Sequence, residues 1–229
     1  MKFGILFQSV SKKTLLVLLV MFQNLIMKKL FSLVALIAIS GILFSSFDTN
    51  GLDVGDKATD FRLLNVDGNM VSLADMKDAK GYIVTFTCNH CPFSVMYEDR
   101  IIALNKKYAS MGYPVVAINP NDANRRPGDS FAEMKIRAKE KGFDFPYLYD
   151  ETQEVAKSYG ATRTPHVYLL DASRKVRYIG AIDNNASEAS EVSEYYLADA
   201  IEAIEAGKNP DPDFTKAAGC TIKWKPTPE

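Results

Sequence analysis

The most informative part of this chain reads Tyr82-Ile83-Val84-Thr85-Phe86-Thr87-Cys88-Asn89-His90-Cys91-Pro92. Its apolar residues predict a buried strand at 82–87, and the helical spacing of apolar residues over 93–111 predicts a helix. The two cysteines therefore fall where a strand ends and a helix begins. Helix N-termini carry unpaired N–H groups and partial positive charge, which stabilise a thiolate. A thiolate attacks disulfides, and a second thiol resolves the mixed disulfide, so the pattern predicts redox chemistry.

The first fifty residues differ in composition from the rest. Met27-Lys28-Lys29 precedes an apolar core at 30–44 and a polar exit at 45–50, which is typical of a secretory signal. The core is shorter than the roughly 20 residues of a membrane-spanning helix. We therefore expect translation to begin at Met27 and residues 1–50 to be a leader. The alternative is an uncleaved membrane anchor, because no clean A-x-A cleavage site follows. In both cases we expect the rest of the protein in the cell envelope, in the periplasm or secreted.

Residues 51–229 suffice for one well-buried domain, expected at 51–206, with a C-terminal tail at 207–229. The formal net charge of -1 argues against a nucleic-acid partner. The 3 cysteines are too few for a disulfide scaffold. A C-x-x-C pair in an exported protein is also compatible with a plain structural bridge.

Strands and helices alternate along the predicted domain. The turn 65–69 contains an Asp-Gly step between apolar residues, which predicts a hairpin near the N-terminus. Asp129 or Ser130 is placed to cap a helix that runs to Lys141. The pattern predicts an α/β fold with a mainly parallel sheet, antiparallel pieces at its edges and helices on both faces. Further strands are predicted at 113–118, 145–149, 166–171 and 175–180, and further helices at 152–159 and 190–206.

In three sequence features the chain resembles the thioredoxin superfamily, and more closely its redoxin branch. The opening 52–61 is similar to the branch's G-x-x-A-P-x-F start, with Thr59 where proline is common. The second mark is the C-x-x-C pair, and the third is Thr164-Pro165. The branch includes alkyl-hydroperoxide-reductase/thiol-specific-antioxidant proteins and exported thioredoxin-like reductases. The resemblance covers residues 52–206. It implies a thioredoxin-like fold, a central mixed sheet flanked by helices, with an N-terminal β-hairpin extension.

The resemblance also implies roles for these residues. Pro165 is expected to be cis and to lie against the cysteine pair, which leaves the backbone of Thr164 free to pair with a bound peptide. Proline is the residue for such a bond because its cis form costs only about 0.5–1 kcal/mol.

The leading functional prediction is an exported thiol–disulfide oxidoreductase. Cys88, expected to be exposed, attacks a substrate disulfide, and Cys91, expected to be more buried, releases the product. The partners are a protein or small-molecule disulfide and a thiol electron donor, and no cofactor is expected. A His90 imidazolium is expected to stabilise the Cys88 thiolate, with a solvated turn residue as the alternative. No Asp or Glu occurs within 82–87, so the buried carboxylate of many thioredoxins has no obvious counterpart, which puts fast reductase kinetics in doubt.

The first alternative is a thiol peroxidase with Cys88 as the peroxidatic cysteine. Thr85 stands where peroxiredoxins place their catalytic threonine, although Gly81 replaces the proline of their motif. Arg163 is the nearest candidate for their arginine. Arg163 is otherwise a candidate to lower a thiolate pKa or to bind a substrate carboxylate, or it is a solvated loop residue.

The second alternative is a copper- or zinc-binding module of the same fold. Cys88, Cys91, His90 and His166 are ligands of suitable softness. His166 follows the expected cis-proline and faces the sulfurs only if strand alternation points it that way. The sequence shows no metal-ligand spacing beyond C-x-x-C, so no metal site is predicted.

Cys220 is the odd cysteine. It is a candidate to resolve a Cys88 sulfenate, to pair with a partner or to stay free. The neighbouring Ile222 and Trp224 predict that the tail docks on the domain, and docking without chemistry is the expectation.

Overall fold

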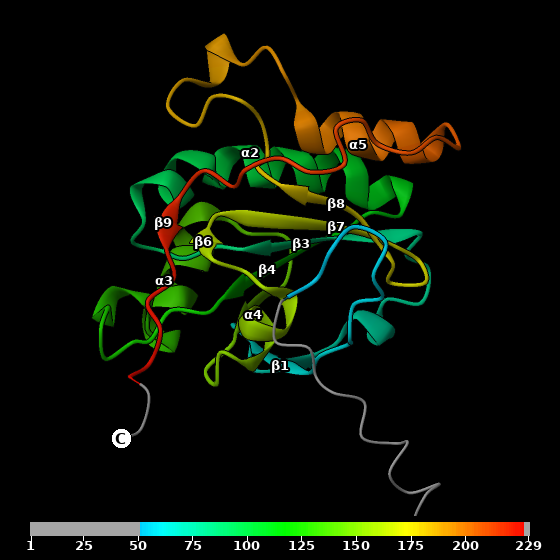
Figure 1. Ribbon diagram of the computed structural model, residues 1–229. Coiled ribbons are helices and arrows are strands. Elements are labelled where there is room, and N and C mark those ends of the chain that lie inside the picture. Colours follow the sequence, from blue (N-terminus) through cyan, green and yellow to red (C-terminus); the bar gives the residue numbers. More distant parts are fainter. Residues whose placement is uncertain (1–50, 227–229) are drawn as a thin grey trace, which may run out of the picture. The chain divides into compact units, whose positions relative to one another are not determined.

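The computed structural model describes residues 51–226 (Figure 1). The expected leader at 1–50 and the start at Met27 lie outside the described residues. Among the helices of residues 51–226, none has the length and apolar character needed to cross a membrane.

A seven-stranded sheet lies at the centre of the domain, in the order β2-β1-β5-β4-β3-β7-β8. The prediction of a mixed sheet is confirmed, but the expectation of a mainly parallel one is wrong. Only the pairings of β3 with β4 and of β4 with β5 are parallel, and the other four pairings of this sheet are antiparallel. A helix between two strands permits a parallel crossover without enforcing one. The strands are β1 (Leu63–Asn65), β2 (Met70–Val71), β3 (Gly81–Phe86), β4 (Val115–Asn119), β5 (Tyr147–Tyr149), β7 (His166–Asp171) and β8 (Val176–Gly180).

Within residues 51–226, four α-helices flank this sheet, and four short 3₁₀ turns join the elements. Ser130, rather than Asp129, caps α3, because its side chain accepts a hydrogen bond from the Glu133 N–H. The helix predicted at 190–206 begins only at Tyr196. The Asn184 side chain accepts the N–H groups of Ser193 and Glu194, which holds that segment outside the helix. The elements are α2 (Pro92–Tyr108), α3 (Phe131–Lys141), α4 (Glu154–Tyr159), α5 (Tyr196–Glu205), η1 (Leu73–Asp75), η2 (Ala109–Met111), η3 (Pro127–Asp129) and η4 (Ala189–Glu191).

Strand alternation divides the core between the two faces of the sheet. Ile83 of β3 packs in one cluster with side chains of α2, α3 and α5, whereas Val84 and Phe86 pack in a second cluster with α4. Figure 1 shows α2 and α5 together on one face and α4 on the other. Every residue of β3 is buried. This strand is therefore a rigid support for the turn that follows it and contains Cys88 and Cys91, residues 88–91, called here the cysteine turn.

A second, two-stranded sheet forms beside the end of β3. β6 (Arg163–Thr164) pairs antiparallel with β9 (Cys220–Thr221) of the C-terminal tail. The tail runs across the domain to reach this position (Figure 1). Ile222, next to β9, is buried in the second cluster. The tail therefore places residues 219–225 next to the cysteine turn.

Candidate active site

The two cysteines of the turn lie where β3 ends and α2 begins. Cys91 is the N-cap residue of α2, and Pro92 is the first residue of the helix. Proline is favoured there because it lacks an N–H that would have no partner in the helix. The local sequence therefore brings both sulfurs to the positive end of the helix dipole.

Thr164 contacts both of these sulfurs. Its hydroxyl oxygen lies 3.3 Å from Cys88 Sγ, and its carbonyl oxygen lies 3.1 Å from Cys91 Sγ. The Cys88 thiol is also 3.8 Å from the Ser94 hydroxyl of α2. The peptide bond from Thr164 to Pro165 is cis. Cys88, Cys91 and the Thr164-Pro165 pair, which the sequence predicted to lie together, are thus neighbours in the structure.

Cys88 is a buried thiol. It is 3% exposed and Cys91 is 5% exposed, so the expectation of an exposed Cys88 is wrong. Burial raises the pKa of the Cys88 thiol, and the Asp129 carboxylate raises it further. The Thr164 hydroxyl and the backbone N–H groups of Cys91 and His90 oppose this rise in pKa without cancelling it. The surroundings of Cys88 therefore disfavour its thiolate.

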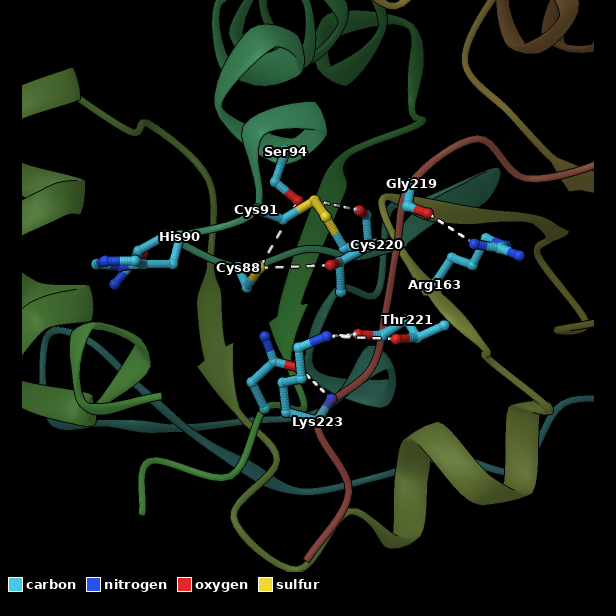
Figure 2. Close-up of a disulfide and its surroundings, with 12 residues drawn as sticks. Cys88, His90, Cys91, Ser94, Arg163, Gly219, Cys220, Thr221 and Lys223 are labelled. Carbon is cyan, nitrogen blue, oxygen red and sulfur yellow. Dashed lines mark hydrogen bonds between the residues drawn. A yellow bond between two sulfur atoms is a disulfide. The ribbon is translucent and has the colours of Figure 1, made fainter. Parts of the chain in front are cut away.

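The His90 side chain does not supply the expected positive charge to Cys88. It is exposed and points away from the three cysteines in Figure 2. Its ring lies against Gly128, where a β-carbon would collide with it. The backbone N–H is the group of His90 that lowers the pKa of Cys88.

A buried carboxylate, Asp129, holds the cysteine turn. One oxygen accepts the N–H groups of Asn89 at 2.9 Å and His90 at 3.1 Å, and the other accepts the Asn121 side-chain amide at 2.8 Å. The sequence analysis considered Asp129 only as a helix cap. The signal that it missed is topological: β3 and β4 are parallel neighbours, so the loops that follow them meet at one edge of the sheet.

The Asn89 side chain also fixes the turn. The Tyr147 hydroxyl donates a hydrogen bond to its carbonyl oxygen at 2.9 Å, and its amide donates to the Gly128 carbonyl at 2.9 Å. The turn is therefore held by groups from β5 and from the loop before α3.

The disulfide of the described structure joins Cys91 to Cys220, and Cys88 is the free cysteine (Figure 2). This differs from the expected pairing of Cys88 with Cys91 and from the expectation that the tail docks without chemistry. The pairing of β6 with β9 sets Cys220 opposite Thr164, whose carbonyl oxygen contacts Cys91. The two α-carbons are consequently 6.0 Å apart, within the range of a disulfide.

Arg163 and Thr85 do not form a peroxide-binding arrangement around Cys88. The Arg163 guanidinium donates a hydrogen bond to the Gly219 carbonyl at 2.8 Å (Figure 2), so it binds the tail rather than a thiolate. The buried Thr85 hydroxyl has no hydrogen-bond partner among residues 51–226.

The His166 side chain contacts groups other than the sulfurs. Its ring packs beside Tyr168 in the second core cluster, and its Nδ1 lies 3.4 Å from the Thr162 N–H, from which it accepts a hydrogen bond. Burial lowers its pKa to about 4, and the charge of Arg163 contributes in the same direction. Within the described part of the chain, no group of three or more His, Cys, Asp or Glu residues is arranged to hold a metal ion. The geometry therefore gives no support to the copper or zinc alternative.

A small cavity of about 140 Å³ lies beside the disulfide. Basic side chains of Arg126 and Lys223 line it together with the three cysteines. Because Cys88, Cys91 and Cys220 all line this cavity, it leads to the three cysteines.

The fold and the site together define a thioredoxin-like protein with a cysteine pair at a helix N-terminus and a cis-proline beside it. The chain belongs to the redoxin family, whose pattern matches residues 53–196.

Two solved structures share this fold over most of the chain. An uncharacterized conserved protein of Geobacillus kaustophilus is 40% identical, with a TM-score of 0.71 over 78% of this chain and 96% of that one. A hypothetical protein of Sinorhizobium meliloti is 36% identical, with a TM-score of 0.72 over 77% and 97%. Among curated relatives, the thiol-disulfide oxidoreductase ResA of Geobacillus thermodenitrificans is 26% identical over 162 residues, which is 69% of this chain and 87% of ResA.

Proposed function

We propose that this protein is an exported thiol–disulfide oxidoreductase whose catalytic dithiol is Cys88 and Cys91. The observation that carries the proposal is the pair of contacts made by Thr164, one with each sulfur, at the N-terminus of α2. The similarity to ResA, which is named for this activity, supports the same conclusion.

The proposed reaction begins when Cys88 loses its proton and its thiolate attacks a substrate disulfide. The attack forms a mixed disulfide and releases one substrate thiol. Cys91, whose sulfur is next to the Thr164 carbonyl, then attacks Cys88 Sγ, which releases the second substrate thiol and leaves a disulfide between Cys88 and Cys91. A thiol donor of the cell envelope restores the dithiol.

The test is a redox titration of the full chain carrying Cys220→Ser against glutathione buffers, followed by mass-spectrometric mapping. We expect a reversible two-electron couple between Cys88 and Cys91. Failure of this variant to form that disulfide contradicts the proposed function. The matched control is Cys91→Ser in the same background, which removes the couple.

A peroxide assay separates the oxidoreductase from the thiol peroxidase alternative. The raised pKa of Cys88 and the engagement of Arg163 by the tail argue against rapid peroxide reduction. We expect peroxide to be consumed no faster by the full chain than by its Cys88→Ser variant. Rapid consumption that is lost in Cys88→Ser supports the peroxidase instead.

Export is proposed from the sequence of residues 27–50, a basic start followed by an apolar core and a polar exit. N-terminal sequencing of the protein recovered from the cell envelope tests it. A new N-terminus near residue 50 supports a cleaved signal, whereas an intact Met27 in the membrane fraction supports an anchor. Recovery from the cytoplasm contradicts export.

A further inference from the structure

The C-terminal tail occupies the backbone edge that the resemblance assigns to a bound peptide. Cys220 lies opposite Thr164, and Thr221 lies opposite Arg163, in the antiparallel pairing of β9 with β6. The pairing continues where the Ile222 N–H donates to the Thr162 carbonyl at 3.2 Å. A peptide that pairs with Thr164 and the tail therefore compete for one edge.

Around β9, the tail is held at two separate points, one at residues 223–225 and the other at Cys220. Gln153 forms the first: its amide donates to the Lys223 carbonyl at 2.9 Å, and its carbonyl oxygen accepts the Lys225 N–H at 2.7 Å. The second point is the disulfide with Cys91 and the strand pairing around Cys220. Residues 219–221 can thus leave β6 while residues 222–225 stay docked.

A chain of hydrogen bonds joins the cysteine turn to the same tail. Asp129 accepts the turn's N–H groups and the Asn121 amide, and the Asn121 carbonyl oxygen accepts the Lys223 N–H at 2.8 Å. The tail is therefore part of the site and not a surface appendage.

We propose that the tail is a tethered occupant of the peptide edge and that Cys220 is a third redox-active cysteine. Its disulfide with Cys91 closes the site, and Cys88 reopens the site by exchanging with that disulfide. This inference rests on the proposed function, because the site that the tail closes and opens is the site of the Cys88/Cys91 dithiol.

The exchange conserves atoms and electrons. Cys88 loses a proton and its thiolate attacks Cys91 Sγ, which forms the Cys88–Cys91 bond and breaks the Cys91–Cys220 bond. Cys220 leaves as a thiolate and takes up a proton, so the chain keeps one disulfide. The thiol electron donor of the proposed function, here a dithiol, then reduces the Cys88–Cys91 disulfide and is itself oxidised to a disulfide. Closure of the resulting dithiol form requires a two-electron oxidant, a disulfide such as oxidised glutathione, which is reduced to two thiols.

A substitution at Gly219 displaces the tail while all three cysteines stay in place. A β-carbon at Gly219 would collide with the Thr164 carbonyl, so Gly219→Ala forces β9 away from β6. Ala218 is exposed, so Ala218→Ser is the matched control. Cys220→Ser removes the closing disulfide itself.

The experiment compares oxidised full-length chains in two measurements. The first is a disulfide map, and the second is the rate at which each chain oxidises a synthetic peptide with two cysteines. We expect Cys91–Cys220 in the wild type and in Ala218→Ser, and Cys88–Cys91 in Gly219→Ala and Cys220→Ser. If the tail closes the site in about nine of ten wild-type molecules, the fraction of protein that reacts with the peptide falls about tenfold. Gly219→Ala and Cys220→Ser should therefore oxidise the peptide about tenfold faster than the wild type.

The outcomes separate this inference from the proposed function. Equal or slower peptide oxidation by variants that carry Cys88–Cys91 overturns the closing role of the tail and leaves the oxidoreductase intact. A wild-type chain without the Cys91–Cys220 disulfide overturns it as well. If Cys220→Ser forms no Cys88–Cys91 disulfide, the proposed function itself fails.

Discussion

At the scale of single residues, the reactivity of Cys88 is set by a balance between burial and hydrogen bonding. Burial and the Asp129 carboxylate raise its pKa, while the Thr164 hydroxyl and two backbone N–H groups lower it. Glu98 and Tyr147 also line a small cavity on the inner side of Cys88. The sequence pattern, which suggested a thiolate stabilised by a helix N-terminus, contained no sign of the desolvation that outweighs that effect.

Replacement of Asp129 by Asn should lower the pKa of Cys88, because it removes a nearby negative charge while keeping a side chain of the same shape. The measurement is the rate of iodoacetamide alkylation against pH in the Cys91→Ser/Cys220→Ser background, where Cys88 is the remaining cysteine. We expect the midpoint to move to lower pH in Asp129→Asn. Asp78, which is exposed, provides the control Asp78→Asn. An unchanged midpoint would show that Asp129 does not act on Cys88 by its charge.

His166 should make the domain less stable in acid. Its pKa is lowered from 6.5 to about 4 in the folded protein, so between these pH values the unfolded chain binds a proton that the folded chain does not. Stability therefore falls as pH decreases through this window, by about 2 kcal/mol at pH 5 relative to pH 7. Urea unfolding at both pH values should show this loss in the wild type and in His90→Gln. His166→Gln should lack it, and an equal loss in both variants would contradict the assignment.

At the scale of elements, the sequence predicted local structure well and long-range pairing poorly. The hairpin β1–β2, the strand–turn–helix unit from β3 to α2 and the hairpin β7–β8 follow from turn residues and hydrophobic periodicity. The antiparallel direction of β7 beside β3 depends on how the chain re-enters the sheet after α4, which no local pattern encodes.

The pairing of β9 with β6 was missed for the same physical reason. Each of these strands contains two residues, too few for an alternating pattern. Their pairing depends on the free edge at Thr164 and on anchors elsewhere, such as Asn121 and Gln153. The sequence likewise contained no sign that Asp129 contacts the cysteine turn. Its hydrogen bonds to the Asn89 and His90 N–H groups join residues that are 40 and 39 positions apart in the chain.

The anchor at Gln153 leads to a prediction for β9 and the segment that follows it. Gln153→Ala removes one of the two donors to the Lys223 carbonyl, which keeps the Asp122 N–H, and removes the partner of the Lys225 N–H. The loss should weaken docking of residues 222–225 by about 1–3 kcal/mol. Hydrogen exchange followed by mass spectrometry should show roughly tenfold or greater acceleration in this segment. The fluorescence of Trp224, the single tryptophan of the chain, should change with it. Glu151→Ala, at an exposed position nearby, should leave both signals as in the wild type.

At the scale of the whole molecule, the two alternative disulfides constrain the unfolded chain to very different extents. The Cys91–Cys220 bond joins residues 129 positions apart, whereas a Cys88–Cys91 bond encloses only Asn89 and His90. Loop-closure entropy grows with the logarithm of loop length, so the longer loop should stabilise the fold by about 3 kcal/mol more than the shorter one.

The choice of disulfide should therefore be visible in global stability. We expect chemical denaturation of the oxidised wild type to give a free energy of unfolding about 3 kcal/mol higher than that of oxidised Cys220→Ser. Under reducing conditions the two proteins should be close to one another, because neither carries a disulfide. Cys88→Ser should keep the gap between its oxidised and reduced forms, since the Cys91–Cys220 bond does not require Cys88. Loss of that gap in Cys88→Ser would mean that the wild-type disulfide involves Cys88, and the tail would then be docked by non-covalent contacts alone.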